Sequence, residues 1–474
     1  MENKIVFRNH ISTILEGTVR AVGIIFFAFI GGFLQDTGGN SLYDTLIFVA
    51  LMLAALVIAV GWQVLIWSKT YITIQENTII VERKTLNYKK NTIGIKNVSN
   101  VNLEQNLFEM MLGTCKVKLD TNSLSTADST DVKIILKKRD AERFKMLILG
   151  QIQNEIVPTE GEGATSFVEA KSYVASTADI IGHGIFSVNI VSALVFVGGV
   201  LGTIELFKEL INAGSSEGLW DILLTIFVVG WFLLGIFWNL AKGFVQYINF
   251  RVERRENQIH INYGLIKKVN YSVPVDKINA VTMNQTMFAR IGKRYTVELI
   301  NVGMGDDENE ANSFFLPYSK KEKVEELFEL LLPEFEACMH IEEKRQPKCV
   351  WIIWLIPTII YLAVMGVGLG AVAELIPEFL APVIAGVVVM SVYLLVARLL
   401  SYFTEGSKMQ NDFLKLVSGS FGRKIVFIKS EKIQFVTLKQ NFLAKKFGVQ
   451  KGTIHLLAAM KNQIHNLPYF EGKI

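Results

Sequence analysis

The chain has 474 residues, of which 51% are hydrophobic and 19% are charged, and its mean hydropathy is +0.35. Soluble domains carry about 25% charged residues, so this composition excludes a wholly soluble protein. Nine prolines, aperiodic glycines and three cysteines exclude collagen-like, disordered and disulfide-scaffold proteins. Cys115, Cys338 and Cys349 show no metal-ligand spacing, so we expect reduced thiols and no metal or cofactor.

Six apolar stretches are long enough to cross a bilayer, and they come in three pairs. They are residues 18–34 and 45–67, 184–206 and 219–240, and 350–373 and 379–401. All seven tryptophans lie inside them, and several lie near their ends, where the headgroup region favours amphipathic rings. The pattern predicts six transmembrane helices in three hairpins, with an uncleaved first span instead of a signal peptide.

The charges that flank these stretches predict their orientation. Each loop within a pair is short and acidic, as at Asp36 and Asp44, whereas bases such as Lys69 and Arg398 lie at the outer ends. By the positive-inside rule, both termini and all long segments are cytoplasmic, in a multi-pass protein of the cell (plasma) membrane. His183, near the start of the third span, is expected at the membrane interface.

The segments that follow the hairpins repeat one another. Each contains Ile or Val, then Val three residues later, Gln four residues after that, Phe or Leu three residues further on, and finally Gly. The first, glutamine and glycine positions are Val98, Gln105 and Gly113; Ile278, Gln285 and Gly292; and Ile433, Gln440 and Gly448. Self-similarity on this scale indicates one structural unit used three times.

Period-two alternation predicts antiparallel strands on both sides of each motif, for example at residues 71–74, 78–82 and 115–119. Helical patterns close the first two repeats at residues 140–149 and 319–331. The third repeat has no room for this helix, so it is either shortened or completed by another element.

The expected organisation alternates hairpins with cytoplasmic domains. The hairpins lie in residues 1–67 (with the N-terminal segment), 180–242 and 350–403, and the domains are 68–157, 243–336 and 404–474, the last without its closing helix. Linkers are expected at 158–179 and 337–349. The fold class is thus an α+β polytopic membrane protein.

Three copies of the motif beside three hairpins resemble the bacterial PH-like domain membrane proteins, in their long type with three hairpin-plus-PH-like units. The resemblance covers nearly the whole chain and implies that each cytoplasmic unit is a split barrel of antiparallel strands closed by a helix. It implies no enzymatic activity. Some relatives are linked to tolerance of, or immunity to, membrane-active peptide bacteriocins, and the resemblance implies such a role here.

Basic pairs are the main candidate binding residues. They precede each motif by about ten residues, and the third repeat adds another pair: Lys89 and Lys90, Lys267 and Lys268, Arg423 and Lys424, and Lys445 and Lys446. Residues 398–474 hold 13 bases against 4 acids. Two interpretations stay open, an ordinary solvated face beside the membrane or a surface for anionic lipids or a partner.

The repeated glutamines and glycines also allow two interpretations. A recognition site is one. The other is structural: the glutamines satisfy backbone groups, and the glycines supply a turn conformation.

Three classes of function compete. The first is a non-enzymatic scaffold or defence protein that contacts inner-leaflet lipid or a companion PH-like membrane protein. The alternative is a transporter or channel component, although the spans hold almost no charge. An enzyme lacks a plausible acid, base or metal cluster in this sequence. No nucleic-acid partner is expected, because we find no stacking platform or reader motif.

Overall fold

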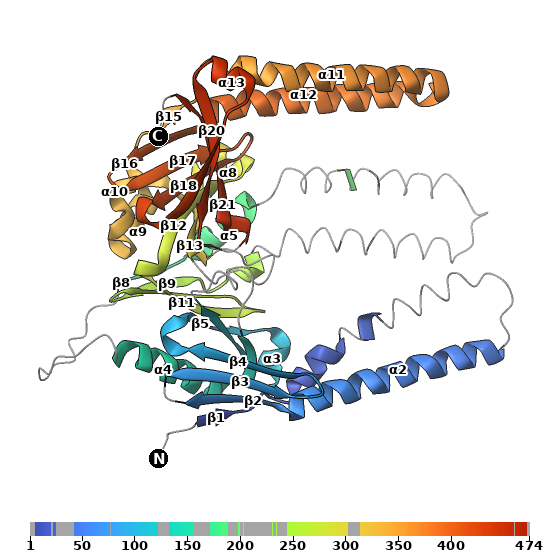
Figure 1. Cartoon of the computed structure of the whole chain (residues 1–474), viewed down its shortest axis with the longest axis vertical. Coiled ribbons are helices and arrows are strands. Elements are labelled where there is room, and N and C mark those ends of the chain that lie inside the picture. The colour runs from blue at the N-terminus through green and yellow to red at the C-terminus, as the bar shows by residue number, and fades with distance from the viewer. Residues whose placement is uncertain are drawn as a thin grey trace, which may run out of the picture. The chain divides into compact units, whose positions relative to one another are not determined.

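A computed structural model describes residues 5–19, 22–24, 42–75, 77–121, 132–154, 171–187, 244–301, 313–458 and 460–471, with isolated positions between 198 and 234 (Figure 1). The chain forms two compact units. Unit 1 comprises residues 1–126, 130–166 and 266–272, and unit 2 comprises 127–129, 167–265 and 273–474.

Unit 1 contains two antiparallel sheets and a closing helix. The first sheet has the order β1-β2-β3-β4, and the second runs β7-β6-β5-β11 within this unit. The elements are β1 (Ile5–Phe7), α2 (Leu42–Ser68), β2 (Thr70–Gln75), β3 (Thr78–Lys84), β4 (Tyr88–Gly94), β5 (Val98–Gln105), α3 (Leu107–Met111), β6 (Thr114–Thr121), β7 (Val132–Lys137), α4 (Lys138–Asn154) and the start of β11 (Lys268–Pro274).

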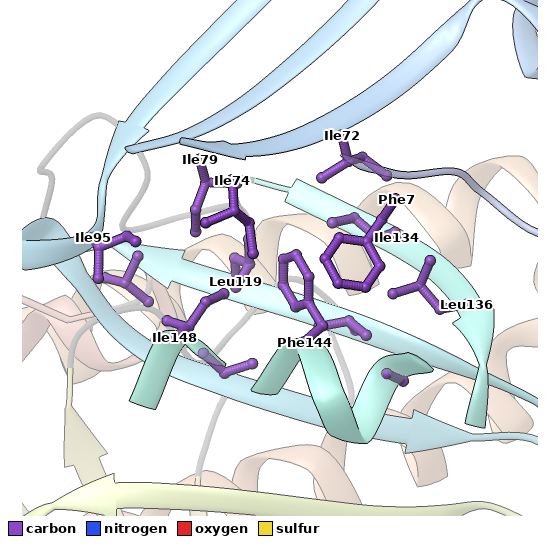
Figure 2. Close-up of a cluster of buried hydrophobic side chains, with 14 of the residues drawn as sticks. Phe7, Ile72, Ile74, Ile79, Ile95, Leu119, Ile134, Leu136, Phe144 and Ile148 are labelled. Atoms are coloured by element: carbon purple, nitrogen blue, oxygen red, sulfur yellow. The ribbon is translucent and has the colours of Figure 1, made fainter. Parts of the chain in front are cut away.

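The core of unit 1 lies between these sheets and α4. Alternating isoleucines such as Ile72 and Ile74 of β2 point inward, as period-two patterning requires. Figure 2 shows Phe144 and Ile148 of α4 pointing into the same cluster, where the rings of Phe7 and Phe144 meet edge to face at 5.1 Å. Complete burial of each side chain of this size stabilises the fold by roughly 1.5–3 kcal/mol. These contacts hold α4 against the two sheets, where it closes the barrel.

Unit 2 holds the remaining described elements. They are β8 (Lys171–Val174), α5 (Thr177–Phe186), β9 (Arg251–Arg255), β10 (Gln258–Tyr263), β12 (Ile278–Gln285), α8 (Met287–Ile291), β13 (Arg294–Asn301), β14 (Ser313–Lys320), α9 (Lys321–Leu331), α10 (Glu336–Met339), β15 (Lys344–Arg345), α11 (Val350–Leu375), α12 (Leu380–Thr404), β16 (Gly406–Gln410), β17 (Phe413–Ser418), β18 (Arg423–Lys429), β19 (Ile433–Lys439), α13 (Phe442–Lys446), β20 (Val449–Leu456), α14 (Met460–Gln463) and β21 (Ile464–Glu471).

The main sheet of unit 2 joins two sequence repeats. Its order is β14-β13-β12-β18-β17-β16-β15, so β12 of the second repeat lies between its own β13 and β18 of the third repeat. The β12–β18 ladder runs over six paired positions, from Ala280 opposite Ile428 to Gln285 opposite Arg423. In unit 1, β5 of the first repeat pairs in the same way with β11 of the second, with Lys268 opposite Gln105. Successive repeats are therefore linked by an antiparallel strand pair.

The third repeat shares its core with the second. Its apolar cluster contains Ile428, Ile454 and Leu467, and it also takes in Ala280 and Ile300 of the second repeat. The Asn279 amide donates to the Leu457 carbonyl at 2.6 Å across the same boundary. Among the described residues, no helix follows β21, and part of this core is supplied by the neighbouring repeat.

Three described helices are long and apolar enough to cross a membrane, over residues 49–68, 350–375 and 383–404. They belong to α2, α11 and α12, and the last two lie side by side, joined by a short turn (Figure 1). The spans predicted at 18–34, 184–206 and 219–240 lie largely outside the described residues.

His183, expected at the membrane interface, is enclosed by protein side chains in this structure. His183 lies on α5 and is buried against β14, stacked on Tyr318 at 5.2 Å and in edge contact with Tyr247 and Phe314. Burial lowers its pKa to about 4. Helix α5 is thus packed against β14.

Candidate functional site

The three repeated glutamines make the same hydrogen bond. The side-chain nitrogen of Gln105 donates to the Thr114 carbonyl at 2.7 Å, and those of Gln285 and Gln440 donate to the carbonyls of Arg294 and Val449 at 3.0 Å. In each case the acceptor lies nine residues on, at the start of the next strand. A buried carbonyl without this partner would cost about 1–3 kcal/mol, which gives the glutamines a structural task.

The glycines that follow are not equivalent. Gly113 and Gly448 have φ near +65°, a conformation that glycine adopts without strain. In the second repeat the left-handed residue is Lys293, with φ +50°, and Gly292 has an ordinary φ. A Cβ on Gly292 would lie 2.7 Å from the Phe186 ring. The shorter Gln-to-Gly spacing of this repeat therefore reflects a packing requirement.

The second and third basic pairs lie at the junctions between repeats. Lys267 forms an ion pair with buried Glu104 at 3.4 Å, and Lys118 approaches the same carboxylate at 2.7 Å. Burial raises the pKa of Glu104, but the two lysines outweigh it and hold that pKa below its ordinary value. Lys268 lies directly opposite Gln105 in the strand pairing. Lys267 therefore helps to balance the charge of Glu104 within the fold.

Arg423 and Lys424 occupy the corresponding place in unit 2. Arg423 contacts the Glu343 carboxylate, which Lys415 also approaches at 2.8 Å. Lys424 lies opposite Asn284 of β12. A hollow of about 580 Å³ adjoins this group and is lined by Arg423, Lys415, Glu343 and neighbouring residues.

The remaining predicted bases are exposed. Lys89 and Lys90 lie on β4, where Lys90 comes within 3.8 Å of Glu82. Lys445 and Lys446 form the last turn of α13. These two pairs are therefore exposed to solvent, unlike Lys267 and Arg423, which form ion pairs at the junctions.

Unit 2 contains a second candidate site, where the apolar helices α11 and α12 meet the third repeat. Val350 and Ile353 of α11 are buried against Ala444 of α13, Val449 of β20 and Tyr469 of β21. Trp354 and Tyr402 pack on the edge of this cluster. The contacts fix the base of α11 and α12 on the third repeat.

A cleft of about 370 Å³ opens beside this contact. Its lining residues come from α11, α12 and strands of the third repeat, and they include Trp354, Arg398, Glu405, Ser418, Lys439, Lys451, Thr453, Asn466 and Tyr469. The Arg398 guanidinium lies 5.5 Å from the Trp354 ring centre, and the Lys451 ammonium lies 5.5 Å from that of Tyr469. Three bases against one carboxylate leave the cleft positive.

The single carboxylate is partly withdrawn from the cleft. Glu405 follows α12 and accepts a hydrogen bond from the Gln346 amide at 2.6 Å. Burial raises its pKa, and this gain exceeds the opposing effects of the Gln346 hydrogen bond and of Arg398 and Lys451. The cleft accordingly keeps an excess of positive charge.

The predicted binding residues did not include Arg398, Lys439 or Lys451. A signal was present, because Arg398 lies inside an apolar run three residues before its predicted end. An ionisable residue at such a depth is a functional lead. The convergence of Lys439 and Lys451 on it depends on tertiary packing.

The fold defines a membrane protein whose soluble part consists of repeated PH-like split barrels. Residues 24–152, 192–335 and 359–471 match the family described as Bacterial PH domain, and together they make up more than half of the chain, which therefore belongs to this family. The chain is also 23% identical over 432 residues to the UPF0699 transmembrane protein YdbT of Bacillus subtilis (strain 168), covering 86% of this chain and 84% of that protein.

Proposed function

We propose that the chain is a non-enzymatic scaffold and defence protein of the plasma membrane, which gives tolerance or immunity to membrane-active peptides through lipid or protein contacts at the inner leaflet. In this proposal six spans form three hairpins and both termini are cytoplasmic, as the flanking charges favour.

The observation that carries the proposal is the attachment of α11 to the third repeat. The buried contact of Val350, Ile353 and Tyr469 joins a membrane-spanning helix rigidly to a soluble domain. A domain held in this way keeps one face at the headgroups. In this proposal the cleft with Arg398, Lys439 and Lys451 lies at that level, and its three bases suit it to anionic groups.

The protein contact is assigned to the free edge of β19. Its counterparts β5 and β12 each pair with a strand of the following repeat, whereas β19 pairs with β20 alone among the described strands. Phe435, Val436 and Leu438 of β19 are exposed. An open edge with apolar side chains favours strand addition from another chain.

Charge narrows the choice of partner. Lys439 takes the position held by Glu104 in β5 and Asn284 in β12. If β4 of a second copy added in the observed register, Lys89 would lie opposite Lys439, and like charges directly opposite are unfavourable. We therefore propose that the partner is a companion PH-like protein, and that its added strand places an acidic residue opposite Lys439.

Survival of a sensitive Gram-positive host tests the proposal. Cells that express the full chain are titrated with pore-forming cationic peptides, beside an empty vector, Val436→Asp and the matched control Met409→Asp on exposed β16. Protection by the wild type and the control, with loss in Val436→Asp, supports a role that needs the β19 edge.

Two outcomes count against it. Absence of protection against every peptide removes the defence role. The other outcome is that the purified wild-type chain forms dimers that the Val436→Asp variant does not form. That result would show that the partner is a second copy of this chain and not a companion protein.

A further inference from the structure

Two lysines of the basic cleft occupy directly opposed positions on neighbouring strands. Lys439 of β19 lies directly opposite Lys451 of β20, and both line the cleft. Like charges at such a cross-strand pair are unfavourable. No carboxylate in the described part of the chain forms an ion pair with either lysine. A bound anion would relieve this repulsion, and Arg398 lines the same cleft.

An apolar groove continues from the cleft along the membrane helices. It has a volume of about 200 Å³ and is lined by Pro357, Tyr361 and Leu362 of α11 and by Ser391, Leu394 and Leu395 of α12. The groove and the cleft share Trp354 and Arg398. From Trp354 to Leu362 the helix rises roughly 12 Å, which fits within the ~15 Å depth of one leaflet.

We propose that the cleft and the groove together bind one anionic glycerophospholipid of the leaflet nearest the domains. Its phosphate lies between Arg398, Lys439 and Lys451, and one acyl chain lies in the groove between α11 and α12. The proposal rests on the proposed function for the membrane orientation of the hairpin.

The same lining favours a headgroup with hydroxyls. Ser418, Thr453 and Asn466 bring neutral polar side chains to the cleft, and the Glu405 carboxylate adds acceptors. A glycerol headgroup can donate to these groups, whereas a choline headgroup has no donor. Phosphatidylglycerol is therefore the expected class of ligand, and a soluble phosphate lacks the chain that the apolar groove accommodates.

The test compares lipids on the purified full-length chain. After delipidation in detergent, the protein is titrated with phosphatidylglycerol, phosphatidylcholine or soluble glycerol phosphate, and bound lipid is counted by native mass spectrometry. The wild type is expected to retain phosphatidylglycerol roughly tenfold better than phosphatidylcholine, a ratio that corresponds to about 1.4 kcal/mol.

The variants separate the headgroup from the chain. The triple change Arg398→Gln, Lys439→Gln and Lys451→Gln is expected to abolish the preference. The control Lys277→Gln, Lys320→Gln and Lys432→Gln removes the same charge from residues outside the cleft and the groove and is expected to keep it. Leu362→Trp, which fills the groove, is expected to lower retention of both lipids. If the triple variant does not fold, Lys451→Gln alone takes its place.

Three results would overturn the site: equal retention of both lipids by the wild type, an equal loss in the control, or equally tight binding of glycerol phosphate. The outcome is independent of the survival assay. Selective retention without protection keeps the lipid site and removes the defence role, and protection without selective retention does the reverse.

Discussion

β12 and β19 occupy the same position in successive repeats, yet one is core and the other is surface. Val281 of β12 is fully buried, whereas Val436, its counterpart in β19, is 40% exposed. Met283 is buried and Leu438 is exposed in the same way. The difference lies in β18, which covers β12 and has no equivalent on β19 among the described strands. Burial of this strand therefore accompanies its pairing with the next repeat.

Placing the same charge on both strands gives the largest expected effect. Val281→Asp inserts a carboxylate between β13 and β18, and we expect it to reduce the free energy of unfolding by about 4 kcal/mol. In Val436→Asp the new charge stays in water, so we expect the free energy of unfolding to change by about 0.5 kcal/mol or less. Thermal unfolding of the purified chain in detergent measures both. Equal losses would mean that β19 is covered in the isolated protein.

The junction in unit 1 provides the second comparison, because Glu104 of β5 holds the position that Lys439 holds in β19. Glu104→Gln removes the carboxylate that lies 2.7 Å from buried Lys118, and we expect the free energy of unfolding to fall by about 3 kcal/mol. The wild-type contribution is present at neutral pH, since the pKa of Glu104 is lowered on folding, and it fades as pH falls below 4.5.

Unfolding curves at pH 7 and pH 4 test this sign. The gap between wild type and Glu104→Gln should narrow at the lower pH. A gap that widens on acidification would show that Glu104 is not held ionised by its lysines.

The smallest effects concern the turn after the glutamine. Lys293→Gly relieves a left-handed lysine and is expected to stabilise the protein by about 1 kcal/mol. Gly448→Ala introduces the same strain into the third repeat and should cost about as much, although no neighbour obstructs the new methyl. Melting curves of the two variants beside the wild type test this prediction. Melting temperatures that shift in the same direction in both variants would contradict the assigned turn geometry.

Much of the architecture follows from the sequence. The repeated motif locates β5, β12 and β19 at 98–105, 278–285 and 433–439, and alternation locates the strands around them. Sequence does not tell which strand covers each edge. Every repeat offers the same pattern, so pairing within a repeat and pairing between repeats carry the same local signature. The strand pairs Lys268–Gln105 and Arg423–Gln285 appear only in the fold.

The candidate site was harder to predict. The basic pairs were visible, but Lys267 and Arg423 turn out to neutralise Glu104 and Glu343, which are remote in sequence. The cleft unites Arg398, Lys439 and Lys451 from a membrane helix and two strands, and no spacing rule connects them. The burial of His183 could not be predicted for a related reason: the aromatic rings that bury it come from residues 247, 314 and 318.

Strand pairing between repeats has a consequence for synthesis. About 160 residues separate Gln105 from Lys268, so at roughly 5–20 residues per second the ribosome needs of the order of ten to thirty seconds to deliver the strand that covers β5. During that interval a nascent edge is open to wrong partners. The order of translation therefore favours cis pairing only if the intervening chain keeps consecutive repeats close together.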